Sequence, residues 1–301
     1  MYWPTKPGAV PLDELGWINT TYLAMANVDC DPTIVWGTTV ETEPLEAFLV
    51  EERRKTGLLI SPAHLLVRVV AEALQRHPAL RRRAVGRRMY HYDGVNITMP
   101  MLQTRTGEVD VVFLRRVQDM TLADVARSMW NEARDVALRA ADADRQSREG
   151  NWLSKWKRAL ARRARLTWIH RMAWLGFWIT NRFRLPTTCL DEINGSNAFV
   201  NFLGFPGAPP MISYKPSTLP TNSFGVSVTM GPAEPRPVVV QGEVAVRKQA
   251  SVFVRVDHRL VNGHQTAQFV NTVRGLLLDP QVFAHAVDAP PASAHPHRRA
   301  A

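Results

Sequence analysis

The chain has 301 residues, of which 46% are apolar, and a formal net charge of +10. This length and apolar content suffice for one sizeable hydrophobic core. The N-terminus lacks the basic and apolar runs of a signal peptide, and no window of about 18 uncharged apolar residues predicts a membrane-spanning helix. Only two cysteines occur, Cys30 and Cys189, which argues against a disulfide framework and favours a reducing, cytoplasmic setting.

Hydrophobic periodicity predicts helices and strands that alternate along the chain. Apolar residues recur at helical spacing in 45–55, 63–76, 120–136 and 266–278. Ser61-Pro62 marks the start of the second helix, and Thr121 is a suitable N-cap for the third. Strands are predicted at 33–40, 94–99, 108–115, 198–203, 224–230 and 251–256, with a hairpin turn at 241–243 between short strands 238–240 and 244–246. Helices between the strands of a mixed sheet predict an α/β fold.

The positive charge is concentrated in one part of the chain. Residues 151–190 contain nine Lys or Arg and no Asp or Glu, so they supply +9 of the net charge. The rest of the sequence is almost balanced. We therefore interpret the chain as a near-neutral domain with one basic insertion, and not as a generally basic nucleic-acid-binding protein.

The most informative motif is Asp257-His258-Arg259-Leu260-Val261-Asn262-Gly263, between the last predicted strand and the last predicted helix. A histidine at a strand end is held by two rigid elements. A neutral imidazole, which in general titrates near pH ~6.5, can take a proton from a thiol or hydroxyl at physiological pH. The alternative is a histidine in a strand-to-helix turn with no chemical role.

This motif resembles the D-H-R-x-x-[DN]-G signature of the acyltransferase (E2) catalytic domain of 2-oxoacid dehydrogenase complexes. Chloramphenicol acetyltransferase has a related motif, and Asp257 before the histidine favours the E2 branch. Other segments, such as L-L-L-D-P at 276–280, extend the similarity over roughly residues 18–282. The resemblance implies a chloramphenicol acetyltransferase-like mixed sheet flanked by helices. We expect an N-terminal arm at 1–17, an acyltransferase domain at 18–285 with an insertion at 142–186, and a disordered tail at 286–301.

By this resemblance, His258 deprotonates the acyl acceptor, which then attacks a thioester to give an oxyanion. In the E2 family a serine hydroxyl in a G-G-T-F-T-I-S-N-L-G segment donates to that oxyanion. Residues 195–204, G-S-N-A-F-V-N-F-L-G, fit the segment without a gap and put Asn201 at the serine position. An amide N–H can also donate to an oxyanion. The alternative is that Asn201 only satisfies backbone groups inside the sheet.

The remaining residues of the motif are expected to support His258. Asn262 either holds the turn or orients the histidine, with direct participation as the alternative. Asp257 and Arg259 are expected to brace the turn through charge-assisted bonds, and Gly263 is expected to support the site beside them. Four other histidines are expected to be packing, surface or helix-start residues: His64, His77, His91 and His264.

The resemblance also implies a homotrimer whose active sites form between subunits. The sequence shows no lipoylation hairpin, so the expected acyl donor is an acyl-CoA or a thioester on a separate carrier. Coenzyme A is thus expected as a co-substrate, with no covalently bound lipoyl group and no metal. The acceptor is an unidentified thiol or hydroxyl.

The insertion at 142–186 combines basic residues with five of the nine tryptophans. Such a pattern suits a helix in an anionic membrane interface. It could equally cover an acyl-chain channel, form a subunit or partner interface, or pack in the core with a solvated basic face. Nucleic-acid binding is a minor alternative. The candidate contact residues are Trp152, Trp156, Arg162, Arg163, Trp168, Trp174 and Trp178.

Two functions follow from the sequence. The first is a stand-alone cytoplasmic acyltransferase with His258 as general base, with peripheral attachment to the inner face of the membrane as an option. The second is a catalytically weak or inactive trimeric E2-like scaffold. That scaffold would dock partners or a membrane through residues 142–186.

Overall fold

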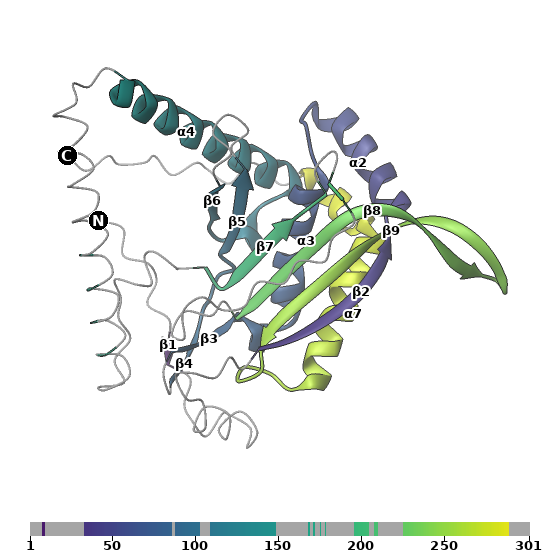
Figure 1. Ribbon diagram of the computed structural model, residues 1–301. Helices are drawn as coiled ribbons and strands as arrows, with labels where there is room; N and C mark the ends of the chain where they lie inside the picture. The colour runs from purple at the N-terminus through teal and green to yellow at the C-terminus, as the bar shows by residue number, and fades with distance from the viewer. Residues whose placement is uncertain are drawn as a thin grey trace.

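The computed structural model describes residues 8–9, 33–85, 88–102, 109–148, 168, 171, 175, 178, 196–204, 208–209 and 225–288. Its centre is a six-stranded sheet with the order β2-β9-β8-β7-β5-β6 (Figure 1). The β5–β7 and β7–β8 pairs are parallel and the other pairs are antiparallel, so the predicted mixed sheet is confirmed. The strands are β2 (Thr33–Glu41), β5 (Ile97–Leu102), β6 (Val109–Leu114), β7 (Ala198–Phe202), β8 (Val226–Val240) and β9 (Glu243–Asp257).

Helices cover one face of this sheet. Helix α3 contacts α7 and β7, and α7 contacts β2, so both helices lie on the same face (Figure 1). The strand residues that point toward them, such as Val200, Val228 and Val254, are completely buried. The helices are α2 (Glu43–Thr56), α3 (Pro62–Arg76), α4 (Leu122–Arg148) and α7 (Gly263–Leu278), with short 3-10 segments η2 (Pro78–Arg81), η3 (Val117–Asp119) and η4 (Pro280–Asp288).

The predicted helix starts are confirmed by their capping contacts. The backbone N–H of Ser61 donates to His64 Nδ1 over 2.9 Å, which closes a capping box at the start of α3. Burial, with a smaller contribution from Arg53, lowers the pKa of His64 to about 4. At α4, Thr121 Oγ1 accepts from the backbone N–H of Asp124 over 3.1 Å. His64 is therefore a packing and capping residue, as the sequence predicts.

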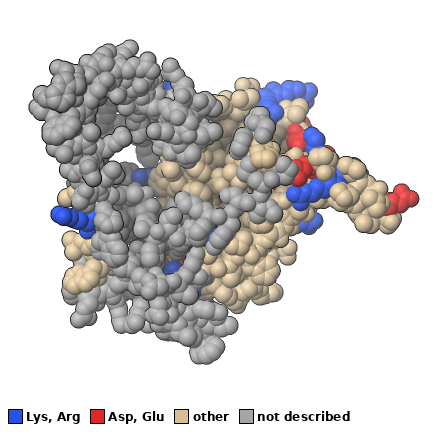
Figure 2. Space-filling view, in the orientation of Figure 1, with Lys and Arg blue, Asp and Glu red and all other residues tan. Residues whose placement is uncertain are grey.

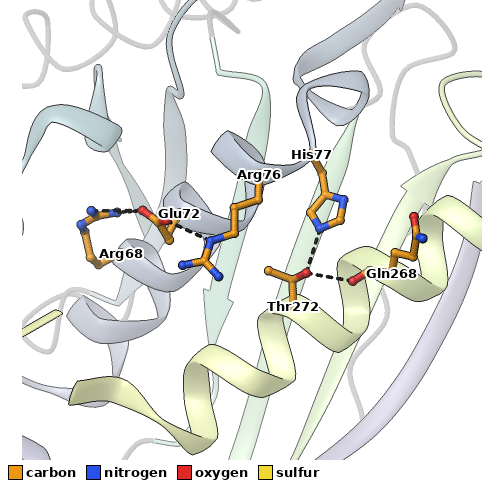
Figure 3. A network of polar contacts seen from close by, with 6 residues as sticks. All are labelled: Arg68, Glu72, Arg76, His77, Gln268 and Thr272. Atoms are coloured by element: carbon orange, nitrogen blue, oxygen red, sulfur yellow. Dashed lines mark hydrogen bonds and ion pairs between the residues drawn. The ribbon is translucent and has the colours of Figure 1, made fainter. Parts of the chain in front are cut away.

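A network of polar side chains runs along α3 and reaches α7 at Thr272 (Figure 3). Glu72 accepts from Arg76 over 3.0 Å and pairs with Arg68. His77 Nε2 lies 2.8 Å from Thr272 Oγ1, and its ring meets Phe269 edge to face. Burial lowers the pKa of His77, with a smaller contribution from Arg76. His77 thus fixes one helix against the other and is a packing residue.

Helix α4 is longer than predicted. The prediction ends it at residue 136, whereas the helix continues to Arg148 and into the region assigned to the insertion. Residues 137–148 are rich in alanine and arginine, which have high helix propensity, but contain few large apolar residues. Periodicity therefore does not reveal this part of the helix. Among the described residues, no helix is long and apolar enough to cross a membrane.

The last hairpin differs most from prediction. The 15-residue strand β8 joins the two predicted strands 224–230 and 238–240. The 15-residue strand β9 likewise joins the predicted strands 244–246 and 251–256. Three prolines in β8 argue against a continuous strand, because proline has no N–H to donate to a neighbouring strand. However, β7 ends opposite Met230, so β8 is an edge strand where Pro235 and Pro237 lie. An edge strand tolerates proline on its unpaired side. Gln241 and Gly242 have φ values of 52° and 90°, as a tight two-residue turn requires.

The outer part of this hairpin, residues 235–248, is called the arm. Beyond the pair of Glu41 with Gln249, β9 also loses its neighbour β2, so the arm is two-stranded and projects from the body (Figure 1). Figure 2 shows that charged side chains of both signs gather at its base, while much of the other described surface in that view is uncharged. At this base Lys248 Nζ lies 3.3 Å from Glu46.

A small second sheet, which the sequence does not predict, has the order β1-β4-β3. It consists of β1 (Gly8–Ala9), β3 (Arg82–Val85) and β4 (Arg88–His91). These strands are two to four residues long and rich in arginine, so they lack an alternating pattern that could be recognised. Burial and the nearby Arg81 and Arg82 lower the pKa of His91.

Candidate active site

The candidate active site is the turn between β9 and α7. Strand β9 ends at Asp257 and α7 begins at Gly263, so residues 258–262 connect them. Leu260 and Val261 in this turn are buried. Their side chains anchor the turn in the core, which fixes the backbone on both sides of His258.

A buried ion pair braces the turn. Arg259 donates from its backbone N–H to Asp257 Oδ1 over 2.9 Å, and from Nη2 to Asp257 Oδ2 over 2.6 Å. The two side chains are only 1% and 6% exposed. The backbone N–H of Asp257 in turn donates to Gly225 on the neighbouring segment over 3.0 Å. These contacts are charge-assisted and shielded from water, so they hold the residues on either side of His258 in place.

The ring of His258 is oriented by the turn itself. Its Nδ1 lies 2.7 Å from the carbonyl oxygen of Val261. A carbonyl oxygen can only accept, so this contact is a hydrogen bond when Nδ1 carries the proton. The neutral ring then has its lone pair on Nε2. The turn therefore selects the tautomer in which Nε2 is the nitrogen that can take a proton.

Asn262 is the N-cap of α7. Its Oδ1 accepts from the backbone N–H of Gln265 over 2.9 Å, and its own N–H donates to Gln265 Oε1 over 3.1 Å. Its carbonyl accepts from Thr266. The side-chain oxygen is thus engaged in starting the helix, which fixes the distance between His258 and α7. Gly263 is the first residue of that helix.

Asn201 does not lie next to His258 within one chain. The register pairs Asn201 with Thr229 and Thr229 with Phe253, which is five residues before His258 along β9. At about 3.3 Å per residue this amounts to roughly 16 Å along the sheet. Because side chains alternate, Asn201 also lies on the face opposite the completely buried Val200, away from α3 and α7.

Sequence reasoning missed a residue that positions β7. Asn197 is completely buried, donates to the carbonyl of Gly94 over 2.9 Å and accepts from the backbone N–H of Asn96 over 2.9 Å. It thereby ties the start of the segment with Asn201 to the turn before β5. A side chain that bonds backbone groups about a hundred residues away in sequence leaves no local pattern by which this contact could be predicted.

The other predicted contact residues are only partly described. Trp168 and Trp178 are exposed. Trp152, Trp156, Arg162, Arg163 and Trp174 lie outside the described residues, as do the tail beyond residue 288 and both cysteines. His264 is exposed at the start of α7, 3.1 Å from Gln268. In the described part of the chain, no group of three or more His, Cys, Asp or Glu could hold a metal ion.

Comparison with known proteins links the turn to a family. The model of the 2-oxoacid dehydrogenases acyltransferase (catalytic domain) family matches residues 222–284, which contain β8, β9 and α7. The lipoamide acyltransferase component of the branched-chain alpha-keto acid dehydrogenase complex of Pseudomonas putida is 32% identical over 103 residues, or 34% of this chain and 23% of that protein. The aligned part thus spans under a quarter of the length of this curated relative.

Solved structures extend the likeness from the motif to the fold. The dihydrolipoamide acetyltransferase of Azotobacter vinelandii has a TM-score of 0.54 and 18% identity over 88% of each chain. A chloramphenicol acetyltransferase has a TM-score of 0.51 and 12% identity over 90% of this chain and 100% of that one. At such identities these structures show the fold alone. Residues 222–284 are thus similar in sequence to the E2 acyltransferase catalytic domains, and most of the chain has the chloramphenicol acetyltransferase-like fold.

Proposed function

We propose that the chain is an acyltransferase with His258 as general base. The observation that supports this most is the contact between His258 Nδ1 and the carbonyl of Val261, because it leaves Nε2 as the basic nitrogen. In the Azotobacter protein the roles of a serine, a histidine and an asparagine in the catalytic mechanism were investigated, and the last two have the spacing of His258 and Asn262. Here the corresponding serine position is expected at Asn201.

The proposed reaction transfers an acyl group from a coenzyme A thioester, or a carrier-bound thioester, to a thiol or hydroxyl. Nε2 of His258 takes the acceptor's proton while the acceptor's sulfur or oxygen bonds to the thioester carbonyl carbon. The tetrahedral oxyanion that results accepts a hydrogen bond from the Asn201 amide. When the oxyanion collapses, the carbon–sulfur bond breaks and the thiolate leaves. The imidazolium then returns its proton to that thiolate, so the base is regenerated.

We propose further that the site is completed between subunits of a trimer. Because the register holds Asn201 and His258 of one chain apart, we assign the donor that faces His258 to a neighbouring subunit. The arm supports such an assembly. All residues of the arm are described, and none of them is buried. Three of its valines, Val239, Val244 and Val246, are 73%, 77% and 71% exposed. An isolated two-stranded hairpin is marginally stable in water, so an exposed apolar arm calls for a partner surface.

The second candidate is a catalytically weak or inactive trimeric scaffold. The observation that favours it is the replacement of the family's serine by Asn201, which offers an amide where a hydroxyl is expected. The scaffold would retain the braced turn and the assembly but accelerate acyl transfer little.

The deciding experiment measures thiol release from acyl-CoA. Acetyl-, butyryl- and octanoyl-CoA are mixed with dihydrolipoamide or simple alcohols, and free coenzyme A is followed for wild type and His258→Ala. We expect His258→Ala to lower kcat/KM by about 10²–10⁴-fold. His264→Ala is the matched control, because this exposed histidine lies at the start of the same helix and should leave the rate unchanged. Equal rates for wild type and His258→Ala would favour the scaffold.

A complementation experiment tests the shared site. His258→Ala and Asn201→Ala chains are each assayed alone and then coexpressed. In a mixed trimer, an intact His258 from one chain meets an intact Asn201 from its neighbour, so the mixture should regain activity. A site contained within one chain would leave the mixture as inactive as the two variants. Light scattering after size exclusion checks that the mixed species is trimeric.

A further inference from the structure

A threonine hydroxyl lies beside Asn201 on the neighbouring strand. Strands β7 and β8 run parallel, and their register pairs Asn201 with Thr229. Paired residues on adjacent strands point to the same face of a sheet, and successive residues alternate between the faces. The preceding pair, Val200 and Val228, is completely buried on the helix side. The Asn201 amide and the Thr229 hydroxyl therefore share the face away from α3 and α7.

The spacing of the two strands allows both groups to reach one atom. Adjacent strands lie about 4.7–4.9 Å apart. A hydrogen bond from a donor to an oxyanion spans about 2.7–3.1 Å. Because twice this length exceeds the strand spacing, donors at paired positions can both contact a single oxygen above the sheet. The register thus places two suitable donors, an amide and a hydroxyl, on either side of one site.

Thr229 differs in its hydrogen bonding from Thr98, a second threonine of this face. Thr98 lies on β5 in register with β7, and both threonines are only 9% exposed. Thr98 Oγ1 donates to Ser196 Oγ over 2.7 Å. For the Thr229 side chain, no hydrogen bond is found among the described residues. A largely buried hydroxyl without a partner is costly in a folded protein, so it points to a ligand atom that accepts from it.

An aromatic ring borders the two donors on the other side. Thr229 pairs with Phe253 on β9, and Phe253 pairs in turn with Gly37 on β2. A Cβ at Gly37 would lie only 2.9 Å from Cε1 of Phe253. The missing side chain at position 37 therefore gives the ring room on the side away from Thr229. An apolar ring next to the donors excludes water, which strengthens hydrogen bonds to a developing charge.

We propose that Thr229 is a second oxyanion donor, acting together with Asn201 of the same chain. This inference rests on the proposed acyl transfer. When the acceptor attacks the thioester carbonyl carbon, the carbonyl oxygen gains negative charge, and the Thr229 O–H and the Asn201 N–H both donate to it. Both protons stay on their donors, so the bonds that form and break are those of the proposed reaction. Thr229 thereby supplies the hydroxyl that position 201 lacks.

The test measures thiol release from acetyl-CoA with dihydrolipoamide for full-chain variants, with His258→Ala assayed beside them. Thr229→Val keeps the branched shape and removes the hydroxyl. It should lower kcat by about 10²-fold with little change in KM, because the donor acts on a charge that develops only after substrate is bound. Thr229→Ser keeps a hydroxyl and should retain most of kcat. Ser227→Ala is the matched control, since it removes a hydroxyl two residues earlier on the same face of β8 and should leave kcat unchanged.

A further variant, Thr229→Ala, keeps the test valid if Thr229→Val does not fold, and circular dichroism with light scattering checks each variant. Wild-type kcat in either folded variant, together with a rate that depends on His258, would overturn the role of Thr229 and leave acyl transfer standing. A rate independent of His258 would overturn both. Equal losses in Thr229→Ser and Thr229→Val would also contradict the proposal, because packing and not the hydroxyl would then be responsible.

Discussion

The two ends of the β8–β9 ladder have similar sequences and opposite surroundings. At the end near His258, valines such as Val228 and Val254 are completely buried under α3 and α7. At the other end, Val244 and Val246 in the arm are more than 70% exposed. On β9, valine alternates with other residues at both ends, and both ends form regular antiparallel pairs with β8. The difference lies in what flanks the strands, because β2, β7 and the helices stop where the arm begins.

This contrast shows where the ladder can tolerate change. The buried end combines apolar packing with an ion pair shielded from water, so it holds the candidate base rigidly. Beyond its base, where Lys248 contacts Glu46, the arm is held by its own strand pairing. We infer that the buried end maintains the geometry of the turn and that the arm serves contacts with other subunits.

The largest expected effect comes from placing a charge at each end. Val254→Asp buries a carboxylate in the core without a partner, at a cost of several kcal/mol that is comparable to the whole stability of a domain. We expect no soluble folded protein. Val244→Asp places the same charge in water and should change the free energy of unfolding by less than about 0.5 kcal/mol per chain. It should lower the oligomeric mass seen by light scattering, and a trimer unaffected by it would contradict the proposed role of the arm.

The next effect concerns the ion pair at the buried end. Asp257→Ala leaves Arg259 buried without its carboxylate and should destabilise the fold by about 3–5 kcal/mol in chemical denaturation. The double variant Asp257→Leu, Arg259→Met should recover much of that loss. Glu51→Ala is the control, because Glu51 and Lys55 are 2.9 Å apart but both are about half exposed. It should cost less than about 1 kcal/mol. Equal losses for Asp257→Ala and Glu51→Ala would remove the distinction between buried and exposed pairs.

A pH profile sharpens the contrast between core and surface. His64 has a pKa of about 4 in the folded chain, against 6.5 when unperturbed, because it is buried beside Arg53. Between these values the unfolded chain binds a proton that the folded chain does not, so stability is lost as the pH falls. The loss should reach on the order of 3 kcal/mol near pH ~4. Denaturation of His64→Gln, which keeps a capping-box residue, should show a flatter profile. Parallel profiles would show that His64 is not responsible.

The smallest effect is expected at the start of α7. Asn262→Ala removes the N-cap and should cost about 1 kcal/mol of stability, whereas Asn262→Asp retains a capping oxygen and should cost almost nothing. If Asn262 serves only to position the turn, Asn262→Asp should also retain the wild-type kcat for thiol release. A loss of activity in this variant at unchanged stability would show that the amide participates in the reaction.

Local signals explain which parts of the fold could be predicted. Ser61 before Pro62 and the apolar spacing of 63–76 predict α3, because capping and periodicity depend on neighbouring residues. The same holds for the turn that contains His258. Local signals predict short separate strands in the arm, because Pro235 and Pro237 indicate strand breaks. The two prolines fit into one continuous strand only because no further strand pairs with β8 at these positions. Residues 137–148 of α4 lack the apolar period on which the prediction relies.

The sequence by itself determined the α/β class, the strand-turn-helix that contains His258 and the residues able to brace it, because these follow from periodicity, capping and side-chain chemistry over short distances. The tertiary structure decided which nitrogen of His258 faces a carbonyl oxygen, since that depends on the carbonyl of Val261 folding back onto the ring. It also decided that Asn201 and His258 lie far apart in one chain, because strand order and register arise from pairings between segments distant in sequence.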